Sequence, residues 1–562
     1  MSIAVKAPRV ARPSEAQATG GRDRILALWP LGVYTLLSLL LFGVPVIGHL
    51  GSRAIASDAI DSSQFMWFLA WWPHAVFHGI NPFVTHAMFV PNGFNLTWST
   101  AMPGPAMLLA PITELFGATV TWNVIQLASP ALSAWTMFLL CRHITDRTWP
   151  SLAGGYVFGF SPYMLIHLTG GPYLALVALL PVFVLLVLRR LEESISPRRF
   201  IVAMTASLTA EYLISSEVLL TATLFGGIAL VLAYAMFAQH RRALVGLLRP
   251  LAIAYGATVV LISPFLYFFF FGHQYPPGAT HFSADLFGFA LPPPFVALSR
   301  QQPPFAGSNT ETYLGLPLII LICLWVWRER HSRRTWLIAL SLAIAAILSL
   351  GGYLFVRGHK TGIPAPWLAI AQLPVLRYAI PIRFAVFVAL PAALIVALWC
   401  RNLDLHSASG LASAALAALA IAFIVPDIGS SGWNTPMRDP AFLRSGAYRT
   451  YLTPRDNVLT IPAWGQNERW QANTGFRFNL SDGYAGNPFP PSYAQYPTWN
   501  TLLTGRLTPD YAAQLRRFIA DKRVTAIVVD RTVPGPWTTL FGSLGVKPVA
   551  TGGVLLYRLP ST

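Results

Sequence analysis

Long runs of apolar residues, separated by short polar segments, dominate the chain between residues 25 and 426. Most of the runs reach the roughly 17 to 25 residues that a helix needs to cross a bilayer. The pattern therefore predicts eleven membrane-spanning helices. The predicted spans are 25–50, 119–141, 151–168, 173–190, 200–215, 218–238, 246–271, 312–327, 335–355, 382–400 and 409–426.

The apolar stretch from 200 to 238 must contain a break. A single helix of that length would extend about 60 Å at 1.5 Å per residue, which is about twice the hydrocarbon thickness of a membrane. We therefore predict that the chain folds back near LISSEV, 213–218, so that two spans replace one.

Basic residues mark one side of the predicted bundle. The polar, basic segment 1–25 is predicted to be a disordered cytoplasmic tail. When the spans alternate in direction, the basic loops RHITDR (142–147), RRLEESISPRR (189–199) and RERHSRR (328–334) fall on the side of this tail. Lys and Arg accumulate on the cytoplasmic side of membrane proteins. The pattern thus predicts a cytoplasmic N-terminus and an extracytoplasmic C-terminus.

The alternation leaves a long first loop, 51–118, and the C-terminal segment on the outside. The C-terminal segment is less apolar than the spans, and it contains strand-like runs and one helical stretch, at 457–462, 524–530, 553–559 and 509–523. It is long enough to bury its own core. We therefore predict an α-helical polytopic membrane protein with a small extracytoplasmic α/β domain, divided into 1–25, 26–426 and 427–562.

Composition supports a membrane protein, with 54% hydrophobic and only 11% charged residues. The net charge of +17 would suggest nucleic-acid binding in a soluble chain, but the basic residues lie in short blocks between spans, so we expect no nucleic-acid partner. The three cysteines lie in or beside spans and indicate no disulfide framework. No P-loop, GxSxG, HExxH or CxxC motif occurs, which excludes the commonest ATPases, serine hydrolases, zincins and thiol oxidoreductases.

The first loop opens with SDAIDSSQFMWFLAWW, 57–72, where Asp58 and Asp61 are three residues apart and would share one face of a helix. The aromatic residues that follow suit the headgroup level, so we predict a helix lying flat on the membrane surface, with a second one at 102–117. DSSQ also matches a capping box in which Asp61 accepts from the backbone and Gln64 reaches back. Capping and catalysis both stay open for the two aspartates.

Two carboxylates and two arginines lie elsewhere toward the outer side. Glu211 and Glu217 fall in or beside predicted spans, where carboxylates are costly and tend to be functional. Arg377 and Arg383, in RYAIPIRF, lie at the outer mouth of the tenth span, and arginine can hold a phosphate bidentately. As alternatives, Glu217 could simply reach water, and the arginines could extend toward lipid headgroups.

Another outer turn, LTGGP, is flanked by His167 and Tyr173. Both side chains could line the same cavity, although a single histidine in such a position is more often structural. The predicted outer loop 272–311 adds three weaker candidates, Asp285, Asn309 and Glu311.

The order of these features resembles the integral-membrane C-type glycosyltransferase superfamily (GT-C), and within it a bacterial group of polyprenyl-phosphate-sugar-dependent transferases. The resemblance covers about 26–426 and rests on one span, a long outer loop opening with acidic residues, flat-lying helices, many spans and an outer domain. Particular stretches also resemble that group, namely FLAWWPHAVFHGINPF (68–83), LISSEVLL (213–220) and RYAIPIRF (377–384).

The resemblance implies a membrane glycosyltransferase of polysaccharide biosynthesis in the bacterial inner membrane. It would move a sugar from a polyprenyl-phosphate donor to a glycan, lipid or protein acceptor of the cell envelope, on the extracytoplasmic face and with inversion. By position, Asp61 matches the general base best and Asp58 second. The arginines would hold the donor phosphate, and the cavity would be lined by Glu217, Glu211, His167 and Tyr173.

Many members of the superfamily carry two adjacent acidic residues, whereas here Asp58 and Asp61 are three apart. The identity of the base and a role for a divalent metal, Mg or Mn, therefore stay open. The outer domain would hold the acceptor through aromatics around DGYAGN, such as Trp464, Trp470 and Tyr484, with structural packing as the alternative.

Two other hypotheses compete with a transferase. A polytopic transporter or lipid-carrier flippase would predict broken helices and paired charges near the bilayer midplane. A non-catalytic envelope assembly protein would predict a first loop without chemistry. The clustering of acids toward one face, together with the large outer segment 427–562, favours the transferase.

Overall fold

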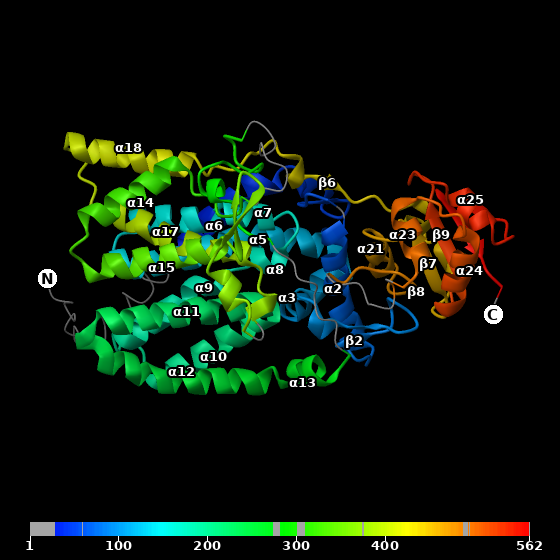
Figure 1. Cartoon of the computed structure of the whole chain (residues 1–562), viewed down its shortest axis with the longest axis horizontal. Coiled ribbons are helices and arrows are strands. Elements are labelled where there is room, and N and C mark those ends of the chain that lie inside the picture. Colours follow the sequence, from blue (N-terminus) through cyan, green and yellow to red (C-terminus); the bar gives the residue numbers. More distant parts are fainter. Residues whose placement is uncertain are drawn as a thin grey trace.

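The computed structural model describes residues 28–58, 60–273, 282–299, 310–373, 376–486, 493 and 495–560. The predicted cytoplasmic tail, 1–25, and Asn309 lie outside the described residues. A bundle of long helices fills one part of the molecule, and a smaller part that mixes strands and helices lies at one end of it (Figure 1).

Each predicted span contains helical structure. The helices are Leu28–Gly43, α5 (Ala118–Thr145), α6 (Thr148–Gly159), α9 (Leu179–Leu191), α10 (Pro197–Ile214), α11 (Ser216–Met236), α12 (Arg241–Leu261), α13 (Ser263–Phe271), α14 (Leu316–Arg328), α15 (Arg333–Ser349), α17 (Ala385–Arg401) and α18 (Ala408–Ala422). Within the described residues, five helical stretches are long and apolar enough to cross a membrane, so the chain is an integral membrane protein. The count of eleven spans stays a prediction.

The predicted break near 213–218 is confirmed. Helix α10 ends at Ile214 and α11 begins at Ser216. Ser215 between them caps α11, because its hydroxyl accepts a hydrogen bond from the Val218 N–H at 3.2 Å.

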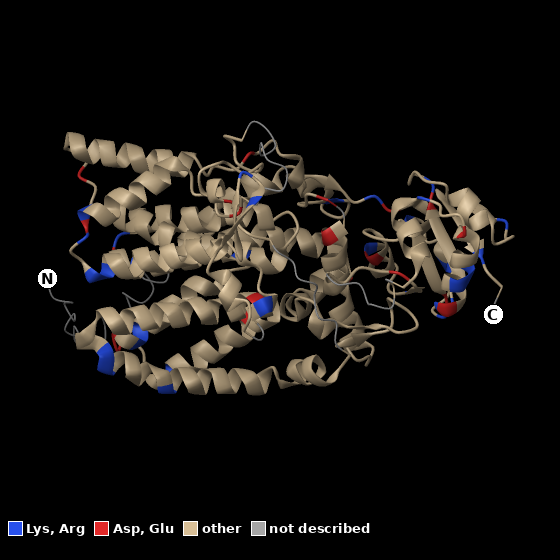
Figure 2. Cartoon of the chain, in the orientation of Figure 1, with Lys and Arg blue, Asp and Glu red and all other residues tan. Residues whose placement is uncertain are grey.

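Lys and Arg gather at the ends of the bundle helices that point away from the C-terminal part (Figure 2). Examples are Arg142 on α5, Arg190 on α9, Arg241 on α12, Arg333 on α15 and Arg401 on α17. This is the distribution on which the predicted topology depends. The orientation in the membrane itself stays a prediction.

The C-terminal part contains a five-stranded sheet with the order β10-β11-β9-β7-β8. Its central strand, β9, runs parallel to β7 and antiparallel to β11. The strands are β7 (Asn457–Ile461), β8 (Asn479–Leu480), β9 (Ala526–Asp530), β10 (Val549–Thr551) and β11 (Val554–Arg558), and the helices around them include α21 (Asn467–Asn473), α23 (Pro497–Thr504), α24 (Tyr511–Asp521) and α25 (Trp537–Gly542). The predicted strand and helix stretches correspond to β7, β9, β11 and α24.

A two-stranded ladder joins the first loop to the start of the C-terminal part. Strand β1 (Arg53–Ala54) pairs antiparallel with β6 (Thr435–Pro436). The Arg53 guanidinium also donates to the Asn434 side-chain oxygen at 2.9 Å. Two segments far apart in the sequence are therefore held together beside the bundle.

Helix α2 (Ile60–Phe77) runs across the ends of the bundle helices, between the bundle and the C-terminal part (Figure 1). The prediction that the aromatic side chains of this helix lie at the lipid headgroups is wrong for those between Phe65 and Trp72, because they are buried inside the protein, whereas Phe77 at the end of the helix is 64% exposed. Trp67, for instance, donates its indole N–H to the Gln471 side-chain oxygen on α21 at 2.7 Å. The physical reason is that the middle of α2 carries apolar side chains around most of its circumference, and a helix of that kind is buried inside the protein.

Two short helices after α2 expose apolar side chains instead. Helices α3 (Pro103–Leu108) and α4 (Ala110–Phe116) leave Leu108, Leu115 and Phe116 between 65% and 79% exposed. This exposure suits the membrane-surface position that we predict for residues 102–117.

Candidate functional site

Asp58 caps the N-terminus of α2 and leaves Asp61 free of that role. One Asp58 carboxylate oxygen accepts from the backbone N–H groups of Ile60, at 2.8 Å, and Asp61, at 3.3 Å. The Asp58 carbonyl also accepts from the Ser62 hydroxyl at 2.8 Å. The predicted capping box with Asp61 as cap and Gln64 as its partner is therefore wrong, because the cap lies three residues earlier.

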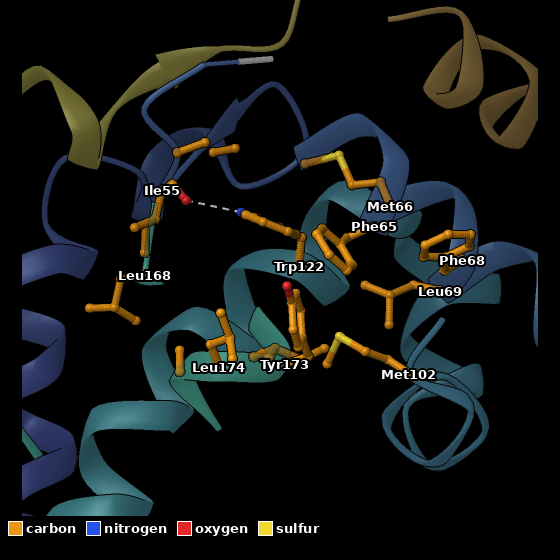
Figure 3. Close-up of a cluster of buried hydrophobic side chains, with 14 of the residues drawn as sticks. Ile55, Phe65, Met66, Phe68, Leu69, Met102, Trp122, Leu168, Tyr173 and Leu174 are labelled. Atoms are coloured by element: carbon orange, nitrogen blue, oxygen red, sulfur yellow. Dashed lines mark hydrogen bonds between the residues drawn. The ribbon is translucent and has the colours of Figure 1, made fainter. Parts of the chain in front are cut away.

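Packing beneath α2 fixes the position of its first turn. The Trp122 indole N–H on α5 donates to the Ile55 carbonyl at 3.1 Å (Figure 3). Phe65, one turn after Asp61, contacts the ring of Tyr173 with 5.4 Å between ring centroids. Tyr173 lies on the short helix α8 (Pro172–Ala175). The predicted cavity residue Tyr173 therefore lies directly below the helix that carries Asp61.

Asp61 lies half-buried among groups from several parts of the chain. The Tyr484 hydroxyl donates a hydrogen bond to its carboxylate. Gly170 lies so near that a Cβ atom there would be 3.8 Å from the Asp61 Oδ2 atom. Burial, followed by the negative charge of Asp58, raises the pKa of Asp61, while the Tyr484 hydrogen bond and the positive charge of Arg383 act in the opposite direction.

Arg383 forms an ion pair with Glu217, the predicted cavity residue at the start of α11. The two side chains are 23% and 17% exposed, so the pair lies mostly out of solvent. The guanidinium carbon of Arg383 lies 5.5 Å from the centroid of the Tyr173 ring, within the range of a cation–π contact. Arg383, Glu217 and Tyr173 therefore form one cluster on the same side as Asp61.

A second pair of polar side chains, a histidine and a glutamate, adjoins this cluster. His167, at the end of α7 (Pro162–His167), lies with its Nε2 atom 3.2 Å from a carboxylate oxygen of Glu311. Tyr163 packs edge-on against the His167 ring at 4.4 Å between centroids. Glu311, a weaker candidate in the sequence, thus joins the predicted residue His167. Asp285 does not join them, because its carboxylate accepts from the backbone N–H groups of Phe287 and Gly358.

Two predicted site residues lie apart from the cluster. Arg377 is exposed and donates to the hydroxyl of Tyr378 at 2.6 Å, and it forms no ion pair within the described residues. Glu211 is completely buried in α10, and neither of its carboxylate oxygens has a hydrogen-bond partner in the described part of the chain. Neither residue forms a hydrogen bond or an ion pair with Asp61 or Arg383 in the part of the chain that the structure describes.

The C-terminal part brings two of the aromatic residues predicted from the sequence to Asp61, and it adds buried acids that the sequence analysis missed. The rings of Trp464 and Tyr484, both half-buried, lie 5.1 Å apart beside Asp61. Trp470, in contrast, is only 1% exposed and belongs to the packing between α21 and the rest of the fold. Two fully buried acids also lie here, and burial raises the pKa of Glu468 to about 8 and that of Asp482 to about 7. The glycine-rich stretch DGYAGN pointed to this loop, but no pattern in the sequence indicated that its tyrosine hydroxyl reaches Asp61.

These residues do not make a good metal site. In the portion of the chain that the structure describes, no group of three or more His, Cys, Asp and Glu side chains is arranged to hold a metal ion. Asp58 is occupied as a helix cap, and the nearest partners of Asp61 are a tyrosine hydroxyl and an arginine. The donor set thus fits a divalent cation poorly, and we derive no step through one.

A comparison with models of known protein families finds a match to the helical bundle. A family model described as "Domain of unknown function (DUF6311)" matches residues 31–425, which is more than half of the chain. The chain belongs to this family. The DUF6311 match includes Asp61 and Arg383 but ends before Tyr484. A search of curated proteins finds no match to the chain.

Solved structures share the fold of this DUF6311 member. The oligosaccharyltransferase AglB from Archaeoglobus fulgidus, in complex with an inhibitory peptide and a dolichol-phosphate, is 12% identical with a TM-score of 0.54, and the match covers 96% of this chain and 74% of that chain. The mycobacterial arabinofuranosyltransferase AftD is 13% identical with a TM-score of 0.52, and the match covers 95% of this chain and 42% of that chain. Both are GT-C glycosyltransferases, so the predicted GT-C fold is confirmed.

Proposed function

We propose that this protein transfers a sugar from a polyprenyl-phosphate donor to a hydroxyl group of a cell-envelope acceptor, on the extracytoplasmic side of a bacterial inner membrane. In this reaction Asp61 removes the proton of the acceptor hydroxyl. The hydroxyl oxygen then bonds to the anomeric carbon, the bond from that carbon to the phosphate oxygen breaks, and the polyprenyl phosphate leaves with the bonding electrons. Attack opposite the leaving group inverts the anomeric centre.

The observation that carries this proposal is the environment of Asp61. Its carboxylate is not used as a helix cap, lies half-buried near the end of the helical bundle, and has Arg383 as its cationic neighbour. A carboxylate in water is a weak base at neutral pH, and the raised pKa of Asp61 makes it a better one. Asp58 has a smaller role here, through its charge and its cap.

Arg383 is the better candidate for the donor phosphate than Arg377. It lies next to Tyr173 and Asp61, whereas Arg377 lies exposed against Tyr378. A guanidinium can bind two phosphate oxygens at once and keeps its charge throughout the reaction. In the structure Arg383 is paired with Glu217. We propose that the donor phosphate replaces Glu217 as a partner of the guanidinium, at least in part, when the donor binds.

Other features support a lipid-linked donor and a sugar acceptor. The neighbour AglB has been solved with a dolichol-phosphate, which is a polyprenyl-type lipid phosphate. Leu108 and Phe116 on α3 and α4 present apolar side chains suited to the membrane surface from which such a donor would enter. The half-buried rings of Trp464 and Tyr484 offer a flat apolar surface beside Asp61 on which a sugar ring can stack.

The proposal is tested by purifying the full chain in lipid nanodiscs and supplying labelled polyprenyl-phosphate sugars, with envelope glycan and glycolipid acceptors. Each reaction runs with and without EDTA, and we expect transfer in both because the described residues hold no metal cage. Transfer of the label with inverted configuration supports the proposal. Well-folded protein that neither binds nor consumes any lipid-phosphate sugar would contradict it.

The burial of the unpartnered Glu211 carboxylate favours the transporter hypothesis, because such a carboxylate is typical of ion and proton pathways. We instead expect Glu211 to have no role in transfer. Glu211→Leu should raise the free energy of unfolding by about 1 to 3 kcal/mol, since it removes a buried polar group that has no partner. Thermal unfolding in nanodiscs measures the change, and Leu208→Ala on the same helix, which opens a cavity, should lower stability as the control. Loss of transfer in well-folded Glu211→Leu protein would contradict this expectation and give Glu211 a role in the reaction.

A further inference from the structure

The loop 482–486 from the C-terminal part lies against the first turn of α2, where Asp61 stands. Its Tyr484 hydroxyl donates a hydrogen bond to the Asp61 carboxylate. The loop belongs to a part of the chain that lies outside the DUF6311 match, yet it reaches the residue that we propose as the general base. The hydrogen bond between Tyr484 and Asp61 can therefore affect the proposed reaction as well as the packing of the loop.

Hydrogen bonds hold the loop at both ends. At its start, the Asp482 carboxylate accepts from the backbone N–H and the hydroxyl of Thr460 on β7, at 3.2 and 2.7 Å. The Asp482 carbonyl accepts from the Phe89 N–H of the first loop at 3.2 Å. Near its end, the Ala485 carbonyl accepts from the Ser99 hydroxyl at 2.7 Å. The backbone on either side of Tyr484 is thus fixed to both the sheet and the first loop.

Two glycines make this path possible. Gly483 and Gly486 have φ values of +140° and +86°, which residues with a Cβ atom rarely adopt. The Tyr484 ring is in turn steadied by Trp464, at 5.1 Å between ring centroids. A tyrosine that is held by its backbone and by its ring can keep its hydroxyl directed at one acceptor.

We infer that Tyr484 is a positioning residue for the general base: its hydroxyl holds the Asp61 carboxylate in one orientation and stabilises the ionised form that accepts the proton. The inference rests on the proposed function, because it gives Asp61 the role of base. It adds that the C-terminal part completes the catalytic site and does more than hold the acceptor.

The ionisable groups near this contact come from each neighbouring element. Asp61 faces Asp58 before α2, Tyr484 from the loop, and Arg383 from the short 3-10 helix Pro381–Phe384. The Tyr173 hydroxyl on α8 lies within the electrostatic range of Asp61. Around Tyr484 itself, the ionisable neighbours are Asp61, Tyr173 and the buried Glu468. Among these groups, Tyr484 and Arg383 are the two that lower the pKa of Asp61.

Tyr484→Phe removes the hydroxyl and keeps the ring on Trp464. We expect kcat to fall about 10-fold or more while KM for the donor changes little, since the phosphate site is untouched. We also expect the acidic limb of the kcat pH profile to move to higher pH. The sign follows because the variant loses a hydrogen bond that lowers the pKa of Asp61, so the base becomes protonated at a higher pH.

The control is Tyr496→Phe, which removes a tyrosine hydroxyl that donates to the Asp521 carboxylate at 2.8 Å, elsewhere in the C-terminal part. It deletes the same kind of hydrogen bond, and it should leave the pH profile unchanged. A Tyr484→Phe profile that superimposes on that of the wild type, or on that of Tyr496→Phe, would overturn the inference.

A second measurement does not need activity. Thermal unfolding of Tyr484→Phe, Asp61→Ala and the double variant forms a double-mutant cycle, because Asp61→Ala removes the acceptor of the hydrogen bond. If the hydroxyl is bound to the Asp61 carboxylate, Tyr484→Phe lowers the melting temperature in the wild-type background and has a smaller effect in the Asp61→Ala background. Strictly additive shifts would refute the contact. A coupled pair in a protein that transfers no sugar would instead refute the proposed function and leave the Tyr484 contact standing.

Discussion

Asp61→Asn lowers the rate of sugar transfer by about 10² to 10⁴-fold, the range expected when a general base is removed. The amide keeps the shape of the side chain and can still accept from the Tyr484 hydroxyl, but it cannot take the acceptor proton. Stability should change little, because Asp61 does not cap α2. Single-turnover transfer from the labelled donor, at saturating acceptor, measures the effect on the chemical step.

The matched control for this variant is Asp58→Asn. Asparagine is as good a helix cap as aspartate, so α2 keeps its N-terminus. The substitution removes a negative charge that raises the pKa of Asp61, so the acidic limb of the pH profile should move to lower pH while the rate stays within a few-fold of wild type. An inactive Asp58→Asn protein beside an active Asp61→Asn protein would exchange the roles of the two residues.

Arg383→Ala should have the second largest effect, on both stability and transfer. It leaves Glu217 mostly buried and without its partner. Breaking a buried ion pair costs about 3 to 5 kcal/mol, and we expect about 3 kcal/mol here because both side chains keep some contact with solvent. Transfer should be lost as well, since the cation proposed to hold the leaving phosphate is gone.

Combining Arg383→Ala with Glu217→Gln separates these two effects. The double variant has no unpaired carboxylate, so most of the lost stability should return, whereas transfer should stay absent. Arg377→Ala serves as the comparison: this exposed arginine contacts Tyr378, and its removal should change the free energy of unfolding by less than about 0.5 kcal/mol. Thermal unfolding and donor binding in nanodiscs provide both readouts. A double variant that regains stability together with transfer would show that Arg383 has no role in phosphate binding.

Hydrophobic patterning located most of the bundle because a chain inside a bilayer must satisfy its backbone within each helix, which requires long apolar runs. The break between α10 and α11 followed from length alone. The environment of α2 could not be predicted in the same way. A tryptophan ring is accommodated both at a lipid headgroup and inside a protein, so the residue type did not distinguish Trp67 facing the membrane from Trp67 bonded to Gln471.

The candidate site, too, could be predicted only in part from the sequence. Asp61 could be singled out because it opens a long outer loop, and Arg383 because a cation at that position runs against the charge bias. The partners of these residues could not be found from local pattern, since Arg383 pairs with a residue 166 positions away. Arg377 and Arg383 cannot be distinguished by residue type. Only the fold shows that Arg383, and not Arg377, lies beside the mostly buried carboxylate of Glu217. Tyr484 was noted for its ring, whereas its hydroxyl carries the contact.

The ladder between β1 and β6, together with the loop that carries Tyr484, has a consequence for biosynthesis. Asp61 is made early and Tyr484 more than four hundred residues later. At about 5 to 20 residues per second, a ribosome needs on the order of 20 to 85 s to cover that interval. During this time the first loop exists without strand β6 and without the Tyr484 hydroxyl. The contact between Asp61 and Tyr484 therefore forms only in the last stage of translation, after all the helices of the bundle have been made.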